Sequence, residues 1–217
     1  MRPPRFRLHH ARNSRSARIL WLLEEAGAAY ELVRHDLSEG TQKRPDYLAL
    51  NPAGKVPALE DLGPDGAWRD VVVTESAAIC AYVADTLPEA ALAPPIGTPG
   101  RAAYANWMAW CPGVLEPAFA DLVFPRAAEA PRRSLGWPAY PEAEARLEAV
   151  LSAGGPWLLG DRFSAADILI GSMLQWLDAW GKLQSGEALR RYLGALEGRA
   201  ALGRARIRDA EAETAAP

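Results

Sequence analysis

The chain has 217 residues and a formal net charge of −3, from 24 basic and 27 acidic side chains. Nucleic-acid binding uses clustered excess lysine and arginine, so this charge balance argues against a nucleic-acid partner. Hydrophobic residues make up 49% of the chain and charged residues 24%, which is typical of a packed globular protein and excludes a disordered one. The apolar runs are far shorter than the roughly 20 residues that a membrane-spanning helix needs, so we expect no membrane partner.

The first part of the chain alternates extended and helical patterns. Residues 6–9 have the pattern of a strand, and a helix capped by Ser14 or Ser16 is expected to run to Ala26. A second strand over residues 30–33 would lie parallel to the first if this helix is a crossover.

Four further elements complete this first part. A helix is expected over residues 45–50, strands over 56–59 and 69–73, and a closing helix over 75–87. The Gly-Pro-Asp-Gly turn at residues 63–66 predicts that the last two strands form an antiparallel hairpin. The predicted order is β-α-β-α-β-β-α.

Prolines and glycines then interrupt the regular pattern over residues 88–99, which predicts a linker. The remaining segments have helical spacing, and they cover residues 102–124, 141–151, 164–180, 187–196 and 199–210. Pro112 and Pro117 are expected to kink or interrupt the first of these helices. We therefore predict an α/β domain over residues 1–87 and an all-α domain over residues 100–217, whose tail from residue 211 frays.

The two cysteines, Cys80 and Cys111, both lie among apolar residues and neither belongs to a CxxC motif. A disulfide framework is therefore not expected, and a reducing compartment such as the cytoplasm is. We also expect no bound metal.

The most informative motif is Asn-Pro-Ala-Gly-Lys-Val-Pro at residues 51–57. A proline at the start of an internal strand is unusual because it cannot donate a hydrogen bond to its neighbour. A cis Val56–Pro57 bond would explain it and would leave the backbone of Val56 able to pair with an extended ligand. The alternative is a trans proline on an edge strand, which base rates alone would favour.

A second motif, Thr74-Glu75-Ser76, follows a predicted strand and opens a predicted helix. Backbone N–H groups at a helix start, together with the Ser76 hydroxyl, suit a carboxylate, and the Glu75 carboxylate suits an ammonium group. The pair would hold the head group of an amino acid. The alternative is ordinary helix capping by Thr74.

A third motif, at residues 13–21, again leads from a strand into a helix. The Ser14 hydroxyl, near the positive end of the helix dipole, would donate a hydrogen bond to an anion such as a thiolate. Arg18 would add positive potential, and such surroundings lower the pKa of a thiol. The alternative is a serine that only caps the helix.

These three segments, in this order, resemble the cytosolic glutathione transferase family, in particular a bacterial, theta-like branch that uses a serine. The resemblance extends over nearly the whole chain. A fourth match, Gly-Asp-Arg-Phe-Ser-Ala-Ala-Asp at residues 160–167, is similar to the family's capping box. Ser164 and Asp167 would therefore be structural residues.

The resemblance implies a thioredoxin-like first domain, with glutathione as co-substrate. Val56 would pair with the cysteinyl part of glutathione, Pro57 would be the cis proline, and Lys55 would lie near the glycyl carboxylate. Glu75 and Ser76 would hold the γ-glutamyl group.

Ser14 matches the family's catalytic serine, counted four residues before Arg18, and Asn13 is its rival because some bacterial branches place the working residue one position earlier. The family's tyrosine classes are excluded, since the first tyrosine is Tyr30. Asn13 stands where a disulfide-forming branch has cysteine, which disfavours covalent thiol chemistry.

The electrophile would be bound by residues of the helix that follows the linker, for which the candidates are Tyr104, Trp107, Trp110 and Cys111. The alternative for this aromatic stripe is helix packing. The resemblance thus implies a homodimeric glutathione transferase whose bound thiolate attacks a small apolar electrophile. Glutathione-dependent peroxide reduction and a non-catalytic ligand-binding or interaction role stay open as alternatives.

Overall fold

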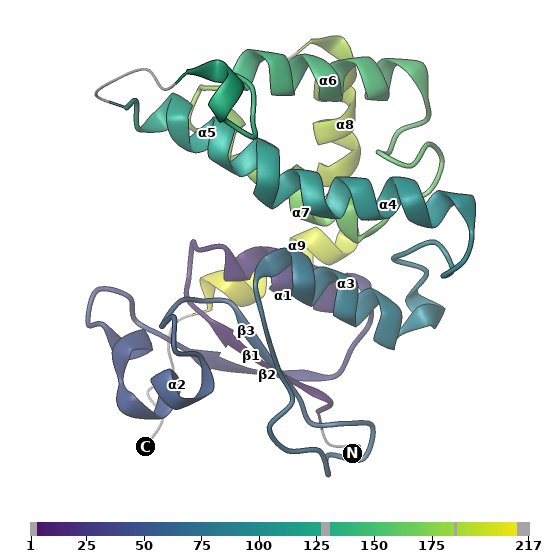
Figure 1. Ribbon diagram of the computed structural model, residues 1–217. Helices are drawn as coiled ribbons and strands as arrows, with labels where there is room; N and C mark the ends of the chain where they lie inside the picture. The colour runs from purple at the N-terminus through teal and green to yellow at the C-terminus, as the bar shows by residue number, and fades with distance from the viewer. Residues whose placement is uncertain (1–3, 127–130, 185, 212–217) are drawn as a thin grey trace. The chain divides into compact units, whose positions relative to one another are not determined.

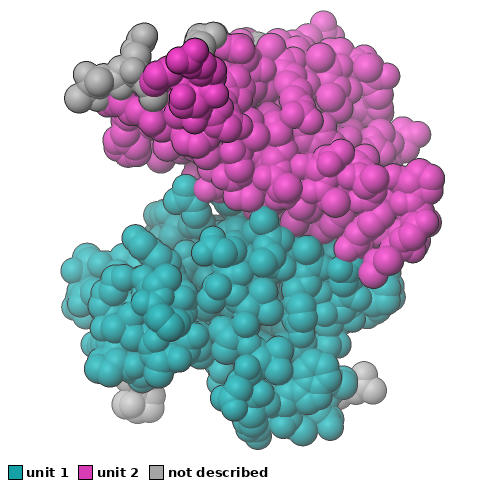
Figure 2. Space-filling model, in the orientation of Figure 1, with its two compact units in different colours: residues 1–90, 199–217 teal, residues 91–198 magenta. Residues whose placement is uncertain are grey.

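The computed structural model describes residues 4–126, 131–184 and 186–211. Contacts between residues divide the chain into a first unit, residues 1–90 with 199–217, and a second unit, residues 91–198 (Figure 2). The predicted domains follow the order of the chain, whereas these units follow contacts, so the last helix is grouped with the first unit. Of the tail that we expected to fray, residues 212–217 lie outside the described residues.

The first unit is built on a four-stranded sheet with the order β2-β1-β3-β4 (Figure 1). The strands are β1 (Phe6–His10), β2 (Tyr30–Arg34), β3 (Ala58–Asp61) and β4 (Val72–Thr74). β1 is parallel to β2 and antiparallel to β3, and β3 is antiparallel to β4. The parallel crossover and the hairpin are therefore confirmed, although β3 and β4 begin two or three residues later than the pattern predicts.

The helices of this unit are α1 (Ser16–Glu25), α2 (Pro45–Leu50), α3 (Ser76–Thr86) and α9 (Ala200–Ala210), with short 3₁₀ turns at Thr41–Lys43 and Pro88–Ala90. The N-cap residue of α1 is Arg15, so the expectation that Ser14 or Ser16 caps it is wrong. The element order is the predicted β-α-β-α-β-β-α, and the fold is thioredoxin-like.

The two faces of β1 carry different side chains, because successive residues of a strand point to opposite faces. Phe6, Leu8 and His10 are fully buried, and His10 contacts Ser16 at the start of α1. His9 points to the other face, where its ring contacts Tyr47 of α2. Figure 1 shows α1 and α3 together over one side of the sheet and α2 apart from them.

α9 is held to α1 by two ion pairs. Arg199 donates to both carboxylate oxygens of Glu25 at 2.5 and 2.7 Å, and Arg204 Nε donates to Glu24 at 2.7 Å. A bidentate arginine–carboxylate pair fixes both distance and orientation. These pairs explain why a helix that follows the second unit in sequence belongs to the first unit by contact.

The second unit is helical, with α4 (Pro99–Trp110), α5 (Glu116–Val123), α6 (Tyr140–Ala153), α7 (Ala165–Ala179) and α8 (Glu187–Glu197). Its described residues form no strand beyond the isolated bridges Trp157–Gly160 and Leu159–Arg162. A π-helical turn at Cys111–Leu115 joins α4 to α5. This turn accommodates Pro112, and Pro117 falls in the first turn of α5, where a proline is tolerated.

The start of α7 confirms the predicted capping box. Ser164 is the N-cap residue, and its N–H donates to Asp167 Oδ2 at 2.9 Å. The other carboxylate oxygen accepts from Leu158 N at 2.9 Å and from the Tyr192 hydroxyl at 3.2 Å. Burial raises the pKa of Asp167 to about 6, although these hydrogen bonds act in the opposite direction. Asp167 is therefore a structural acid that joins three segments of the unit.

Asp167→Ala is expected to lower the free energy of unfolding by about 3 kcal/mol, because it removes the cap and leaves the buried N–H groups of Leu158 and Ser164 without acceptors. Urea unfolding measures the change. Asp178→Ala is the control, since Asp178 is an exposed acid near the other end of the same helix, where removing a negative charge is neutral or slightly stabilising. Equal losses in the two variants would contradict this role of Asp167.

Candidate functional site

The register of the sheet brings the three sequence motifs to one edge. His9 of β1 pairs with Ala58 of β3, and Ala58 pairs with Thr74 of β4. The chain that follows β1, the chain that precedes β3 and the chain that follows β4 therefore leave the sheet at the same edge. These are the segments that contain Ser14, Val56 and Glu75.

The turn after β1 holds the two candidate thiolate ligands. The partly exposed Ser14 hydroxyl donates to Ala11 O at 2.7 Å, lies 2.7 Å from Ser16 Oγ, and accepts from Ser16 N at 3.2 Å. Asn13 is exposed, has a φ of 54°, and its N–H donates to Asp209 Oδ1 at 3.4 Å. Ser14 thus belongs to a hydroxyl cluster, whereas Asn13 lies at the surface of the turn.

The peptide bond between Val56 and Pro57 is cis, as predicted. Just before it, the Lys55 carbonyl accepts hydrogen bonds from the Tyr47 hydroxyl at 2.5 Å and from Asn51 Nδ2 at 2.8 Å. A trans peptide is planar, with its N–H directed opposite to its C=O. These two donors therefore direct the Val56 N–H away from Tyr47 and Asn51.

Lys43 is a second cation beside this segment, which the sequence analysis did not single out. Its Nζ donates to Ala53 O at 3.0 Å, and it packs so closely over Gly54 that a Cβ there would lie 2.6 Å from Nζ. Both Lys43 and Lys55 are exposed. A spacing pattern could not have identified Lys43, because a separate 3₁₀ turn brings it to the loop.

Glu75, not Thr74, is the N-cap residue of α3, and it is exposed with a φ of 67°. That backbone conformation is uncommon for a residue with a side chain and costs on the order of 1 kcal/mol or more. Among the described residues, the Glu75 side chain forms no capping hydrogen bond. The simple capping alternative for this motif is therefore not what the structure shows.

Two buried histidines support the loop that precedes β3, on the face of the sheet that carries α2. His9 Nδ1 lies 2.9 Å from His35 Nε2, and His9 Nε2 lies 3.1 Å from Glu60 Oε1. Because the carboxylate only accepts, His9 donates through Nε2 and accepts through Nδ1 from His35. Both imidazole rings contact the ring of Tyr47, at centroid distances of 4.9 and 4.4 Å. Tyr47 is in this way held where its hydroxyl reaches the Lys55 carbonyl.

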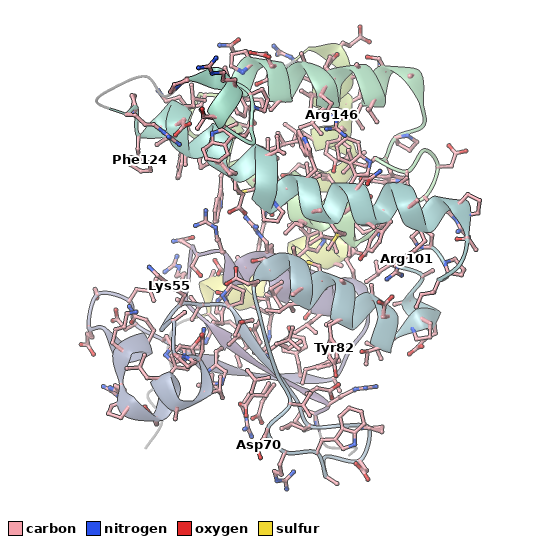
Figure 3. The ribbon with its side chains drawn as sticks, viewed as in Figure 1. Lys55, Asp70, Tyr82, Arg101, Phe124 and Arg146 are labelled. Atoms are coloured by element: carbon pink, nitrogen blue, oxygen red, sulfur yellow. The ribbon has the colours of Figure 1, made fainter. Side chains whose placement is uncertain are left out.

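The four residues that the sequence analysis proposes for electrophile binding are all buried. Tyr104 is 1% exposed, Trp107 and Trp110 are each 6% exposed, and Cys111 is fully buried. The two indole rings meet edge to face at 5.3 Å, and the Arg146 guanidinium lies 5.1 Å from each (Figure 3). These contacts agree with the helix-packing interpretation, and the electrophile role of the four residues stays a prediction.

The thiols of the chain are not exposed nucleophiles. Cys80 and Cys111 are free and buried, and burial raises the pKa of Cys80 to about 12, although the charge of Arg18 acts to lower it. Arg18 is itself only 2% exposed, so its charge lies inside the unit rather than at the surface of the turn. Any thiolate at this edge would therefore come from a ligand.

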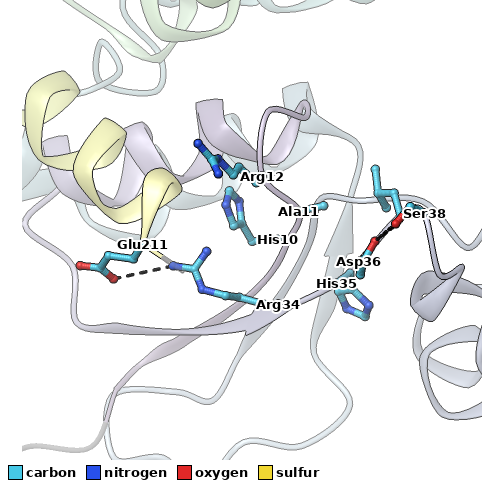
Figure 4. Close-up of a pocket in the computed structure, with 9 residues that line it drawn as sticks. His10, Ala11, Arg12, Arg34, His35, Asp36, Ser38 and Glu211 are labelled. Carbon is cyan, nitrogen blue, oxygen red and sulfur yellow. Dashed lines mark hydrogen bonds and ion pairs between the residues drawn. The ribbon is translucent and has the colours of Figure 1, made fainter. Parts of the chain in front are cut away.

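A pocket of about 390 Å³ opens where β1 and β2 end, near the end of α9 (Figure 4). Its lining includes His10, Arg12, Arg34, Asp36 and Glu211. Arg34 donates to the Arg208 carbonyl at 2.7 Å and lies 3.7 Å from the Glu211 carboxylate. Most of the lining residues are polar or charged, with Ala11 and Leu37 the apolar ones, and the sequence analysis did not predict the pocket.

Within the described ranges, no group of three or more His, Cys, Asp or Glu side chains is placed to hold a metal ion. The helices that the structure describes include none that is long and apolar enough to span a bilayer.

Comparison with known proteins gives the family. Residues 4–85 match the N-terminal domain of glutathione S-transferase, and residues 128–195 match its C-terminal domain. The disulfide-bond oxidoreductase YfcG of Escherichia coli K12 is 31% identical over 80% of this chain and 79% of its own length. The glutathione S-transferase GstA of Escherichia coli O157:H7 is 31% identical over 71% of this chain and 73% of its own.

A solved structure is similar throughout. The glutathione S-transferase of a sphingomonad, complexed with glutathione, superimposes with a TM-score of 0.75 at 31% identity, covering 95% of this chain and all of the other. The chain belongs to the glutathione S-transferase family.

The His9–His35 pair predicts how stability depends on pH. Burial is the largest cause that lowers the pKa of both imidazoles from 6.5. Glu60 acts in the opposite direction on His9, whereas the charge of His9 lowers the pKa of His35 further. Well above pH 6.5 both rings are neutral in the folded and unfolded chains. As the pH falls below that value, the unfolded chain takes up protons that the buried rings resist, so the free energy of unfolding decreases.

Urea unfolding between about pH 7.5 and about pH 5.5 tests this, since each histidine contributes at most about 1.4 kcal/mol per pH unit. His35→Gln keeps a donor toward His9 but does not titrate, so its stability should fall less steeply than that of the wild-type chain. Parallel slopes for the two proteins would contradict the assignment.

Proposed function

We propose that this chain binds glutathione at the shared edge of its sheet and activates the glutathione thiol for attack on a small apolar electrophile. The observation that carries the proposal is the register of β1, β3 and β4. It gathers the Ser14 turn, the cis Val56–Pro57 bond and the start of α3 in one place. The sphingomonad relative, whose structure contains glutathione, supports the choice of ligand.

The backbone around Val56 would pair with the cysteinyl part of glutathione. The Tyr47 and Asn51 hydrogen bonds to the Lys55 carbonyl support this, because they direct the Val56 N–H away from the unit's interior. The exposed cations Lys55 and Lys43 would attract the glycyl carboxylate.

The start of α3 would hold the γ-glutamyl group. The exposed Glu75 carboxylate would accept from the ammonium group, while the Ser76 hydroxyl and the N–H groups of the first helical turn would donate to the carboxylate. Glu75 keeps this position despite its strained φ, and such strain persists only where the surroundings enforce it.

Ser14 would hold the sulfur. A hydroxyl that donates to a thiolate favours the ionised thiol, and one hydrogen bond to a charged group contributes about 1.5 to 3 kcal/mol. We further propose a homodimer in the cytoplasm, as the family resemblance implies.

Disulfide chemistry is the second candidate, because the relative YfcG is named a disulfide-bond oxidoreductase. The cysteines of this chain are buried, so the reacting sulfur would again be that of glutathione. Peroxide reduction would use the same bound thiolate. A purely non-catalytic role is disfavoured, since an interaction module has no need of Lys55, Glu75 and Ser76 at one edge.

Ser14→Ala is expected to lower turnover of glutathione with a chlorinated aromatic electrophile by about 10- to 100-fold, which is the rate equivalent of the lost hydrogen bond. Steady-state kinetics at saturating glutathione measures it. Asn13→Ala is the matched variant on the same turn and should keep turnover within about twofold. If Asn13→Ala instead loses the activity and Ser14→Ala retains it, the roles of the two residues are reversed.

Glu75→Ala is expected to weaken glutathione binding by about 10- to 100-fold, because it removes a charge-assisted hydrogen bond to the ammonium group. Titration calorimetry measures the dissociation constant, with Glu89→Ala, an exposed acid of the same unit, as the control.

Cysteinylglycine, which lacks the γ-glutamyl group, sharpens this test. It should bind the wild-type protein and Glu75→Ala equally weakly. An unchanged affinity of Glu75→Ala for glutathione itself would exclude the proposed clamp.

A further inference from the structure

A chain of polar side chains leads from Ser14 into the interior of the first unit. Ser14 Oγ lies 2.7 Å from Ser16 Oγ, which lies 2.8 Å from His10 Nδ1. On the other side of the ring, His10 Nε2 lies 3.1 Å from Asp209 Oδ1. Ser16 and His10 are fully buried. Two hydroxyls, an imidazole and a carboxylate therefore stand in a row, and this row begins at the proposed sulfur site.

The carboxylate at one end favours one tautomer of His10. Asp209 lies 3.1 Å from Nε2 as an ion-pair contact without hydrogen-bond geometry. A carboxylate only accepts, so this contact favours a neutral His10 with its proton on Nε2, which leaves Nδ1 as an acceptor. Ser16 Oγ, which already accepts from Ala11 N at 3.0 Å, then donates its proton to Nδ1. Ser14 Oγ lies 2.7 Å from both Ala11 O and Ser16 Oγ, and its single proton can be donated to only one of them at a time. When the hydroxyl turns from Ala11 O to Ser16 Oγ, the Ser14 oxygen presents a lone pair outward. In this arrangement the row is set to receive a proton at Ser14.

We propose that Ser16, His10 and Asp209 form a proton relay that takes up the thiol proton of bound glutathione through Ser14. The relay presupposes the proposed glutathione chemistry. The S–H bond breaks and its proton moves to Ser14 Oγ, the Ser14 proton moves to Ser16 Oγ, and the Ser16 proton moves to His10 Nδ1. The products are a thiolate and an imidazolium, with no net gain or loss of protons.

The transfer reverses the hydrogen bonds between Ser14 and Ser16 and between Ser16 and His10. Afterwards His10 donates to Ser16, Ser16 donates to Ser14, and Ser14 donates to the thiolate, while Asp209 faces the new positive charge. An imidazolium close to a thiolate lowers the apparent pKa of the thiol. Ser16, His10 and Asp209 are thus positioning residues, because they act on the sulfur only through Ser14.

His10 lies among charged groups of both signs. The groups that share its pocket are Arg12, Arg34, His35, Asp36 and Glu211 (Figure 4), and Asp209 of α9 faces its Nε2. The titratable groups around the ring are therefore two guanidinium groups, a further imidazole and three carboxylates. Arg34 is also directed to the Arg208 carbonyl and toward Glu211, which partly satisfies its charge.

The test is the pH profile of kcat/KM for glutathione with a chlorinated aromatic electrophile, together with ultraviolet titration of the bound thiolate. His10→Asn keeps a polar group near Ser16 but cannot take up a proton. We expect the acid limb of the kcat/KM profile of His10→Asn to move to higher pH by about one unit. Near pH 6.5 its kcat/KM should be approximately tenfold lower than that of the wild-type protein, and this difference should disappear at alkaline pH.

Ser16→Ala, which breaks the row, should shift the limb in the same direction. Asp209→Asn is a milder change than His10→Asn, because its side chain is partly exposed at 15%, and it should give a smaller shift of the same sign.

Glu24→Gln is the matched control for Asp209→Asn. Glu24 also belongs to the contact between α1 and α9, through Arg204, but has no contact with the row. It should lose stability and keep the wild-type pH profile.

The outcomes separate the relay from the proposed function. If the wild-type protein shows no glutathione binding by calorimetry, the proposed function fails and the relay fails with it. If the wild-type protein conjugates glutathione but the acid limb of the kcat/KM profile lies at the same pH in His10→Asn, in Asp209→Asn and in the wild-type protein, only the relay is overturned. A loss of activity that is the same at every pH would show that His10 is merely structural, and it would also overturn the relay.

Discussion

The antiparallel pairing of β1 with β3 is the constraint on which the site depends. Strand pairing fixes which backbone positions are neighbours, and a slip of one residue would turn every side chain to the opposite face. In this register His9 faces Ala58 and Ala58 faces Thr74. The turn with Ser14, the loop before β3 and the start of α3 are therefore neighbours because of backbone hydrogen bonds, before any side chain contributes.

The alternation of β1 gives that strand two separate roles. His9 points to the side of α2, where it pairs with His35 and supports Tyr47 under the Lys55 carbonyl. His10, the next residue, points to the side of α1, where it contacts Ser16 and Asp209. Adjacent histidines thus serve different parts of one site, one supporting the proposed ligand-binding loop and the other supporting the turn of the proposed sulfur ligand.

α9 connects the end of the chain to this arrangement. Its ion pairs with Glu24 and Glu25 set its position against α1, and this brings Asp209 to the turn after β1. Sequence order suggested a helix of the second domain, since α9 follows α8 directly. The contacts that place it lie more than 170 residues apart in sequence, and a local pattern does not contain such information.

Much of the fold and part of the site could be predicted from local patterns. The hairpin and the capping box at Ser164 each depend on a few adjacent residues whose backbone preferences are strong. The cis bond before Pro57 is expected from its motif and from the family resemblance, since base rates alone favour a trans bond. Tyr47, Lys43 and His10 could not be found in this way, because their relevance comes from contacts between separate elements. The aromatic residues Trp107 and Trp110 show the same limit, since helical spacing alone does not distinguish a pocket wall from the packing around Arg146.

The sequence by itself therefore determined the order of the elements, the family resemblance and the three segments that carry the chemistry, because these follow from short-range preferences and motifs. Only the tertiary structure decided that the segments share an edge, that α9 belongs with α1 and that His10 stands between Ser16 and Asp209. The physical reason is that register and side-chain direction arise from long-range pairing, which sequence spacing alone does not specify.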